Sequence, residues 1–373
     1  MKLTVRLTWK RVFGALAALV LAGLALAWSG IVNIGASTGH WAITDWFLHW
    51  SMRNTVRTYA ALTVQAPAID PTGLVSAAGH FAATCATCHG APGERPSPVM
   101  QSATPDAPDL MQTAGTWNDK ELFWIIRNGI KFTPMPAWPA LSREDEVRRM
   151  AAFVRRLPTM TPETYRTLAY GAGGVPAGNP QTFDDALADC ERCHADDGRD
   201  QPDIPVLAGQ KPAYLLEALR GFAANRRPSG VMSAAAARLD VETMRALAEH
   251  YAKLPGLDED RDAPQATNAV KAASATEIAE AAPEQALVER IVANGLPEHD
   301  LPACAKCHAP GKRPDYPVLA GQKAGYLAAR LWLWRGDPAI VEARQPNDSM
   351  AMIARRIPEH LVEPLARRYA DAR

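Results

Sequence analysis

One five-residue pattern, Cys-x-x-Cys-His, occurs three times in this sequence. The copies span 85–89, 190–194 and 304–308 and contain every cysteine of the chain: Cys85, Cys88, Cys190, Cys193, Cys304 and Cys307. In this pattern two thiols add across the vinyl groups of a haem, and the adjacent imidazole can bind the iron. The sequence therefore predicts three covalently bound haem c groups, with axial iron ligands at His89, His194 and His308.

Other uses of paired cysteines fit the pattern less well. A structural zinc site usually takes its ligands from two pairs about 15–20 residues apart, whereas these pairs are more than a hundred residues apart. A redox dithiol or a structural disulfide needs no histidine after the second cysteine. Only the haem interpretation uses all three fixed residues of the pattern.

The length of 373 residues allows two or three domains, and three haem patterns favour three small ones. The formal net charge is zero, from 40 basic and 40 acidic side chains, so no nucleic acid is expected as a partner. We expect an all-α fold in which each porphyrin supplies part of a small core.

The N-terminal region is typical of a membrane anchor. Residues 1–11 are basic and contain no acidic side chain, and residues 12–39 carry no charge. A spanning helix needs about 20 apolar residues, and a basic flank stays in the cytoplasm. We expect a transmembrane anchor at 12–36, with the rest of the chain outside. A cleaved secretory signal, ending near Ala25-Leu26-Ala27, is the alternative.

An aromatic and basic segment follows at residues 40–66. It combines indole and phenyl rings with two arginines: Trp41, Trp46, Phe47, Trp50, Arg53 and Arg57. This mixture suits a helix in the membrane interface. Packing of the same helix on the first haem domain is an equal alternative.

Composition and helical periodicity divide the remaining chain into haem domains and linkers. The haem domains are predicted at 72–170, 181–255 and 284–373, and the linkers at 171–180 and 256–283. The first domain should close with an apolar-faced helix that begins at a Ser142 cap. The second and third domains are duplicated units, because PVLAGQK at 205–211 returns unchanged at 317–323 with a tyrosine at the same spacing.

Methionine opposite histidine would complete a six-coordinate, electron-transferring iron. Met135 lies between two prolines that hold an extended loop. Internal alignment selects Met232 and Met350, because each stands seven residues before an aliphatic residue, Leu239 or Ile357. In that alignment Met352 becomes a core residue. Coordination by a second histidine is the alternative, through His80, His250, His299 or His360, which share no spacing to the haem patterns.

All three units resemble class I cytochrome c domains, with an attachment pattern, a proline, a methionine loop and a closing helix. Residues 181–373 are similar to the tandem dihaem periplasmic cytochromes c of the c4 type, and residues 1–170 resemble a membrane-anchored monohaem cytochrome c. The resemblance implies that the carbonyl groups of Pro108, Pro205 and Pro317 accept hydrogen bonds from the three haem-binding histidines.

The expected function is that of a membrane-anchored trihaem cytochrome c. It would carry single electrons between respiratory redox partners on the periplasmic side of a bacterial inner membrane. The donor would be a quinol or a substrate dehydrogenase, and the acceptor an oxidase or a soluble cytochrome. One alternative is the cytochrome c subunit of a periplasmic dehydrogenase or terminal oxidase complex. A haem peroxidase or reductase with one five-coordinate iron is a further alternative.

Overall fold

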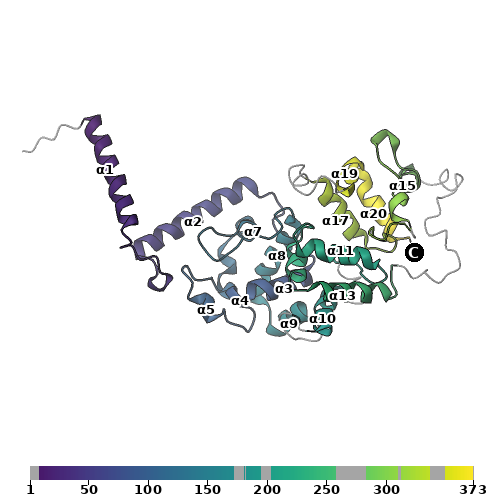
Figure 1. The fold of residues 1–373 in the computed structure, drawn as a ribbon, viewed down its shortest axis with the longest axis horizontal. Coiled ribbons are helices and arrows are strands. Elements are labelled where there is room, and N and C mark those ends of the chain that lie inside the picture. The colour runs from purple at the N-terminus through teal and green to yellow at the C-terminus, as the bar shows by residue number, and fades with distance from the viewer. Residues whose placement is uncertain are drawn as a thin grey trace, which may run out of the picture.

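A computed structural model describes residues 8–171, 180, 182–194, 203–257, 283–309, 312–336 and 349–372. Within these ranges the regular secondary structure is helical and no β-strand forms, which confirms the all-α prediction. Figure 1 shows an N-terminal helix that projects from a row of small helical units, with the C-terminal unit at the opposite end. Most of the predicted linkers, at 172–179 and 258–282, lie outside the described residues, as do residues 1–7 of the basic flank.

The projecting helix α1 runs from Trp9 to Trp28 and buries none of its residues in the protein. It is long and apolar enough to cross a membrane, with a mean hydropathy of 1.9. The predicted anchor at 12–36 is therefore helical only as far as Trp28. The chain beyond it turns through a short 3₁₀ segment, η1, at Ala36–Thr38.

Helix α2, Ala42–Thr63, has two different halves. Its N-terminal half leaves Trp41, Trp46 and Trp50 exposed to solvent. Its C-terminal half buries Val56 and Ala60 against the next unit, where α2 packs on α7, Asp119–Asn128. The C-terminal half of α2 thus packs on the first unit as one alternative predicted, while the interfacial placement of residues 40–66 stays a prediction.

The first unit is built around one apolar cluster that contains Phe81, Phe153 and Tyr165. The predicted closing helix, α8, begins at Glu144 with Arg143 in the N-cap position, so the predicted Ser142 cap is wrong by one residue, and one further helix, α9, follows α8 within the unit. The remaining helical segments are α3 Leu74–His80, η2 Phe81–Cys85, α4 Ala86–His89, α5 Pro98–Gln101, α6 Leu110–Thr113, η3 Ala114–Thr116, α7, α8 Glu144–Arg156, η4 Leu157–Thr159 and α9 Pro162–Tyr170.

The second and third units repeat one arrangement of helices. The second contains α10 Phe183–His194, α11 Pro212–Ala223, α12 Gly230–Ala236 and α13 Val241–Lys253. The third contains α15 Pro283–Ala293, η6 Pro297–His299, α16 Ala305–His308, α17 Ala324–Arg335, α19 Ser349–Arg356, η7 Glu359–Leu361 and α20 Val362–Ala370. In both units the helix after PVLAGQK packs on the closing helix, α11 on α13 and α17 on α20.

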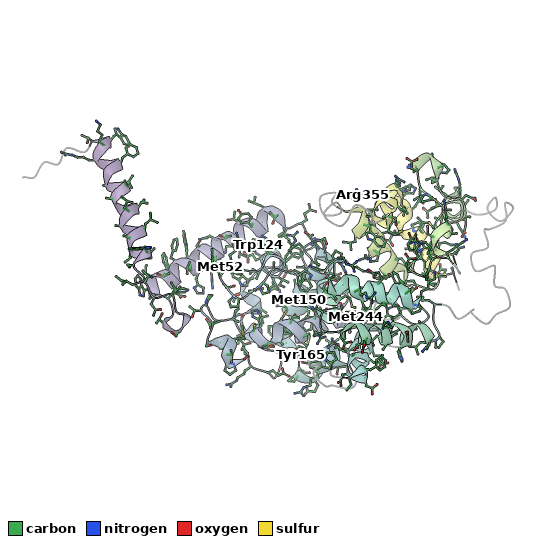
Figure 2. All side chains as sticks on the ribbon, viewed as in Figure 1. Met52, Trp124, Met150, Tyr165, Met244 and Arg355 are labelled. Atoms are coloured by element: carbon green, nitrogen blue, oxygen red, sulfur yellow. The ribbon has the colours of Figure 1, made fainter. Side chains whose placement is uncertain are left out.

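The three closing helices bury the same four positions, spaced by three, one and three residues. This spacing places all four side chains on one face of a helix. They are Val147, Met150, Ala151 and Val154 in α8; Met244, Leu247, Ala248 and Tyr251 in α13; and Val362, Leu365, Ala366 and Tyr369 in α20. Figure 2 labels two of them, Met150 and Met244. The apolar pattern of the closing helix is therefore common to all three units.

The duplicated PVLAGQK motif forms the contact between the second and third units. Each motif glutamine is only 3% exposed and reaches the backbone of the other unit. Gln210 donates to the Val318 carbonyl (3.0 Å) and accepts from its N–H (2.8 Å). Gln322 does the same with Val206, at 3.0 Å for both bonds. The two units are joined by four reciprocal hydrogen bonds about a local twofold relation.

This interface leads to a stability prediction for Gln210→Ala and Gln322→Ala. Either change leaves a partly buried backbone N–H and C=O without these partners, and an unpaired buried group costs about 1–3 kcal/mol. We expect a loss of at least that size in the free energy of unfolding, measured by urea denaturation followed by circular dichroism. Gln112→Ala, which alters an exposed glutamine, is the control. Equal losses in all three variants would contradict the interface.

Candidate haem-binding sites

Each attachment pattern lies on helical backbone. The pattern begins at the end of η2 and continues through α4 in the first unit, lies at the end of α10 in the second, and lies in and just before α16 in the third. Helical spacing puts the two cysteines one turn apart, with the histidine beside the first of them. All six cysteines are partly buried and none forms a disulfide.

The three pattern histidines contact a proline carbonyl in the same way. The ring Nδ1 lies 2.9 Å from the Pro108 oxygen in the first unit, 3.0 Å from Pro205 in the second and 3.1 Å from Pro317 in the third. A carbonyl oxygen only accepts, so Nδ1–H must donate. That tautomer leaves the Nε2 lone pair free to bind a metal.

Burial keeps two of these histidines uncharged. Desolvation is the main cause that lowers the pKa of His194 and of His308, and their proline carbonyls oppose it only in part. A neutral ring is the form that coordinates a metal. The contact therefore fixes the ring orientation in each unit, while the assignment of these residues as iron ligands stays a prediction.

The first cysteine of each pattern is unsuited to thiol redox chemistry. Burial raises the pKa to about 11 for Cys85, about 12 for Cys190 and about 11 for Cys304. Reactive dithiols need a lowered pKa, because the thiolate is the nucleophile. In the part of the chain that the structure describes, no group of three or more His, Cys, Asp or Glu side chains is placed to hold a metal ion. Neither the dithiol nor the zinc interpretation gains support.

The proposed methionine ligands lie in well-defined but different local structures. Met135 is in a loop closed by a hydrogen bond from Ile130 N–H to its carbonyl (3.2 Å). Met232 is in the first turn of α12, and Met350 in the first turn of α19. All three side chains are partly buried. Met352 is 49% exposed, so the prediction that it is a core residue is wrong.

The histidines considered as alternative ligands occupy unrelated places. His299 and His360 are exposed in short 3₁₀ turns. His250 packs its ring edge-on against Phe183. His80 is 7% exposed and packs on Trp138, with ring centroids 4.7 Å apart. Their placement shows no common relation to the three attachment patterns.

Comparison with known proteins supplies the family. A family model described as cytochrome C oxidase, cbb3-type, subunit III matches residues 74–154. Cytochrome c4 from Azotobacter vinelandii is 31% identical over 197 residues, which cover 51% of this chain and 83% of that protein. This chain belongs to the cytochrome c4-like c-type cytochromes.

Two further relatives carry a more specific name. A thiosulfate dehydrogenase electron acceptor from Stutzerimonas stutzeri is 31% identical over 187 residues, or 49% of this cytochrome and 78% of the relative. One from Thiomonas intermedia is 34% identical over 161 residues, or 40% of this cytochrome and 67% of the relative. As a c-type cytochrome the chain binds haem c covalently.

Buried arginines in the cytochrome fit the carboxylates of haem. Arg227 donates to the Tyr214 hydroxyl (3.0 Å) in its own unit and to the Tyr326 hydroxyl (3.1 Å) in the third unit. Arg330 lies close by, where burial, and then the positive charge of Arg227, lower its pKa to about 10. Among the described residues neither guanidinium has a carboxylate partner, and the Nε atom of each lacks a hydrogen-bond partner.

Arg143 brings the first unit to the same cluster, because its charge acts on both Arg227 and Arg330. Buried cations are ordinarily paired, and guanidinium groups pair best with carboxylates. The two propionate groups of a haem have this chemistry, so the residues present fit the cofactor. The sequence analysis missed the cluster, although the tyrosine shared by the two repeats marked Tyr214 and Tyr326.

The buried imidazole of His80 gives the cytochrome a predictable acid sensitivity. Desolvation lowers its pKa to about 4. Between about pH 6.5 and pH 4 the unfolded chain therefore binds a proton that the folded chain does not, so stability falls as pH falls through this window. The contribution is on the order of 3 kcal/mol. His80→Phe, which can still stack on Trp138, should lose less stability than wild type between pH 6.5 and pH 4.5 in urea denaturation.

The control for this prediction is His360→Phe, which changes an exposed histidine and should retain the wild-type pH dependence. An unchanged pH dependence in His80→Phe would contradict the assignment.

Proposed function

We propose that this cytochrome is a membrane-anchored trihaem electron carrier of the periplasm. The observation that carries the proposal is the threefold repetition of one local geometry, Cys-x-x-Cys-His on helical backbone with the histidine Nδ1 at a proline carbonyl. Three such sites in one chain imply three haem c groups. A bound haem iron supplies reversible one-electron oxidation and reduction.

The chain's own residues would hold the iron in a fixed, largely dry environment. His89, His194 and His308 would bind it on one side, and Met135, Met232 and Met350 on the other. Buried helix faces exclude water, and a ligand set that stays the same in both oxidation states keeps rearrangement small. Arg227 and Arg330 would pair with haem propionates where the second and third units meet. These features suit rapid electron exchange.

The proposed anchor is α1, supported by its length, its apolar composition and its complete exposure. The exposed indoles of Trp41, Trp46 and Trp50 follow it directly, and such rings favour the membrane–water interface. Retention of α1 would hold the haem units against the outer face of a bacterial inner membrane.

A redox enzyme and a second electron carrier are the proposed partners. The donor would be a quinol or a substrate dehydrogenase, and the acceptor an oxidase or a soluble cytochrome. The relatives named as electron acceptors of thiosulfate dehydrogenase favour a dehydrogenase as donor. A second candidate function, stable membership of a dehydrogenase or terminal oxidase complex, differs from the first only in the lifetime of the contact.

Single replacements of the methionines test the ligand assignment. Leucine matches methionine in size but has no thioether to bind iron, and loss of a methionine ligand lowers the haem potential. Each of Met135→Leu, Met232→Leu and Met350→Leu should lower one midpoint potential by about 59 mV or more, a tenfold change in a one-electron equilibrium. Each should also remove one methionine-to-iron charge-transfer band from the oxidised spectrum.

The matched control is Met352→Leu, two residues from Met350 on the same helix and exposed. It should leave all potentials unchanged. If Met352→Leu lowers a potential and Met350→Leu does not, the ligand is Met352. If none of the three proposed replacements changes a potential, methionine ligation is contradicted. A high-spin iron in the wild-type protein would instead favour a peroxidase or reductase.

A further inference from the structure

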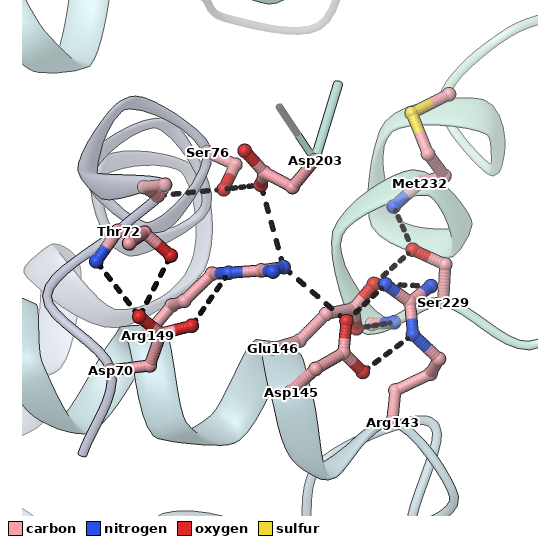
Figure 3. Close-up of polar contacts among 12 residues, drawn as sticks. Asp70, Thr72, Ser76, Arg143, Asp145, Glu146, Arg149, Asp203, Ser229 and Met232 are labelled. Carbon is pink, nitrogen blue, oxygen red and sulfur yellow. Dashed lines mark hydrogen bonds and ion pairs between the residues drawn. The ribbon is translucent and has the colours of Figure 1, made fainter. Parts of the chain in front are cut away.

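One buried carboxylate joins the first unit to the second. Glu146 lies in the first turn of α8 and is 6% exposed. Figure 3 shows it between the two units, facing residues of α12. It accepts hydrogen bonds from the Ser229 hydroxyl (2.6 Å) and the Gly230 N–H (2.7 Å) of the second unit, and from the Trp138 indole N–H (3.1 Å) of the first. Arg143 pairs with it at 2.8 Å.

On the second-unit side, this carboxylate controls the start of the helix that carries Met232. Ser229 is the N-cap of α12, and its hydroxyl oxygen accepts the backbone N–H of Met232 (3.0 Å). The hydroxyl hydrogen is then free to donate to Glu146. A chain of two hydrogen bonds therefore runs from the Glu146 carboxylate to the backbone of Met232.

On the first-unit side, the carboxylate holds the end of the loop that carries Met135. Trp138 stands three residues after this methionine, and its backbone N–H donates to the Arg127 carbonyl (3.0 Å). Its indole lies so close to Gly230 that a Cβ on that glycine would overlap the ring. The indole is thus fixed by its own loop, by Glu146 and by the second unit.

The surrounding charges show that Glu146 is a specific link within a larger network. Arg143 also pairs with Asp145 at 2.8 Å. Arg149, on the same helix, contacts Asp145 (3.3 Å), Asp70 (3.4 Å) and Asp203 (3.4 Å), the last of these in the second unit. Among the described residues, Glu146 hydrogen-bonds both to the loop of one proposed methionine ligand and to the start of the helix of the other, where the Trp138 indole also packs on Gly230.

We propose that Glu146 is a positioning residue that couples the methionine ligands of the first two haem sites. The inference rests on the proposed ligation by Met135 and Met232. The same carboxylate contacts the loop that carries Met135 and the helix that carries Met232. The positions of both sulfur atoms relative to their irons would therefore depend on how the two units dock. The first and second haems then behave as a coupled pair. The described residues of the third unit make no hydrogen bond or ion pair with Glu146, so the third site feels it only through the charge of Arg143 and should respond least.

Glu146→Gln tests the coupling with little change of shape. The amide keeps one oxygen, but its NH₂ group cannot accept from the Gly230 N–H or the Trp138 indole. We expect the midpoint potentials of two haems to shift, each by about threefold in the one-electron equilibrium constant or about 28 mV. Their methionine-to-iron bands should shift as well, while the band of the third haem stays in place and its potential moves less than the other two.

Glu144→Gln is the matched control. It removes the same charge from the same turn of α8, but its carboxylate is 45% exposed, and its ion pairs among the described residues, with Arg127 and Arg148, lie within the first unit. It should leave both bands in place. A Glu144→Gln response equal to that of Glu146→Gln would show a general charge effect and overturn the proposal.

Two further variants each remove one side of the link and keep the test open if Glu146→Gln folds poorly. Trp138→Phe removes the indole N–H, together with the ring atoms that lie against Gly230, and should move most the haem that Met135→Leu moves. Ser229→Ala removes the cap and should move only the haem that Met232→Leu moves. If the methionine variants shift their haem potentials but Trp138→Phe, Ser229→Ala and a folded Glu146→Gln shift none, the coupling is contradicted while the ligand assignment stands. If the methionine variants leave every haem potential unchanged, the ligand assignment is contradicted, and the coupling with it.

Discussion

The proposed function places one constraint on the structure: each small helical unit would have to enclose a flat, apolar haem fixed to its own backbone. The second unit illustrates the need, because among its described residues the contiguous buried cluster is small and is formed by Leu215, Ala248 and Tyr251. A segment of this size rarely buries enough apolar surface to be stable without a covalent or cofactor staple. Haem attachment through two cysteines would supply such a covalent link. It would make helix geometry, core packing and iron ligation depend on the same five residues.

The duplicated motif extends this constraint to the interfaces between units. Within PVLAGQK, the Pro205 carbonyl accepts the hydrogen bond from His194, the next residue pairs with Gln322 of the third unit, and Gln210 returns the contact. The proposed iron ligand His194 is therefore a few bonds from the surface of the neighbouring unit. The link through Glu146 is the counterpart between the first and second units. Rigid docking of this kind keeps haem groups at fixed separations, which single-electron transfer over a chain of sites requires.

Much of the local structure could be predicted from the sequence because its signals are periodic or covalent. The closing helices follow from apolar residues at helical spacing, and the approach of each histidine to a particular proline follows from the family resemblance. The Ser142 cap was wrong because Arg143 lies immediately before the acidic first turn of α8. Met352 was wrong because α19 buries Ala351 and Ala354 and turns Met352 outward.

The contacts between units could not be predicted, because nothing in the sequence pairs their residues. Glu146 stands in an acidic helix start, Glu-Asp-Glu, where all three side chains suggest a solvated surface. Its burial arises only when Ser229 and Gly230 of another unit pack over it. The same holds for Arg227 and Arg330. Their burial beside each other arises only when the second and third units pack together. Tertiary docking, rather than local propensity, decides these positions.

The central claim is that three haem groups are covalently attached to one chain. It is tested most directly by counting iron and haem in purified protein after extraction with acid acetone, which removes haem that is not covalently bound. Three equivalents should remain per chain, and replacing both cysteines of any one pattern with alanine should leave two. Fewer than three equivalents in the wild-type protein would contradict the claim.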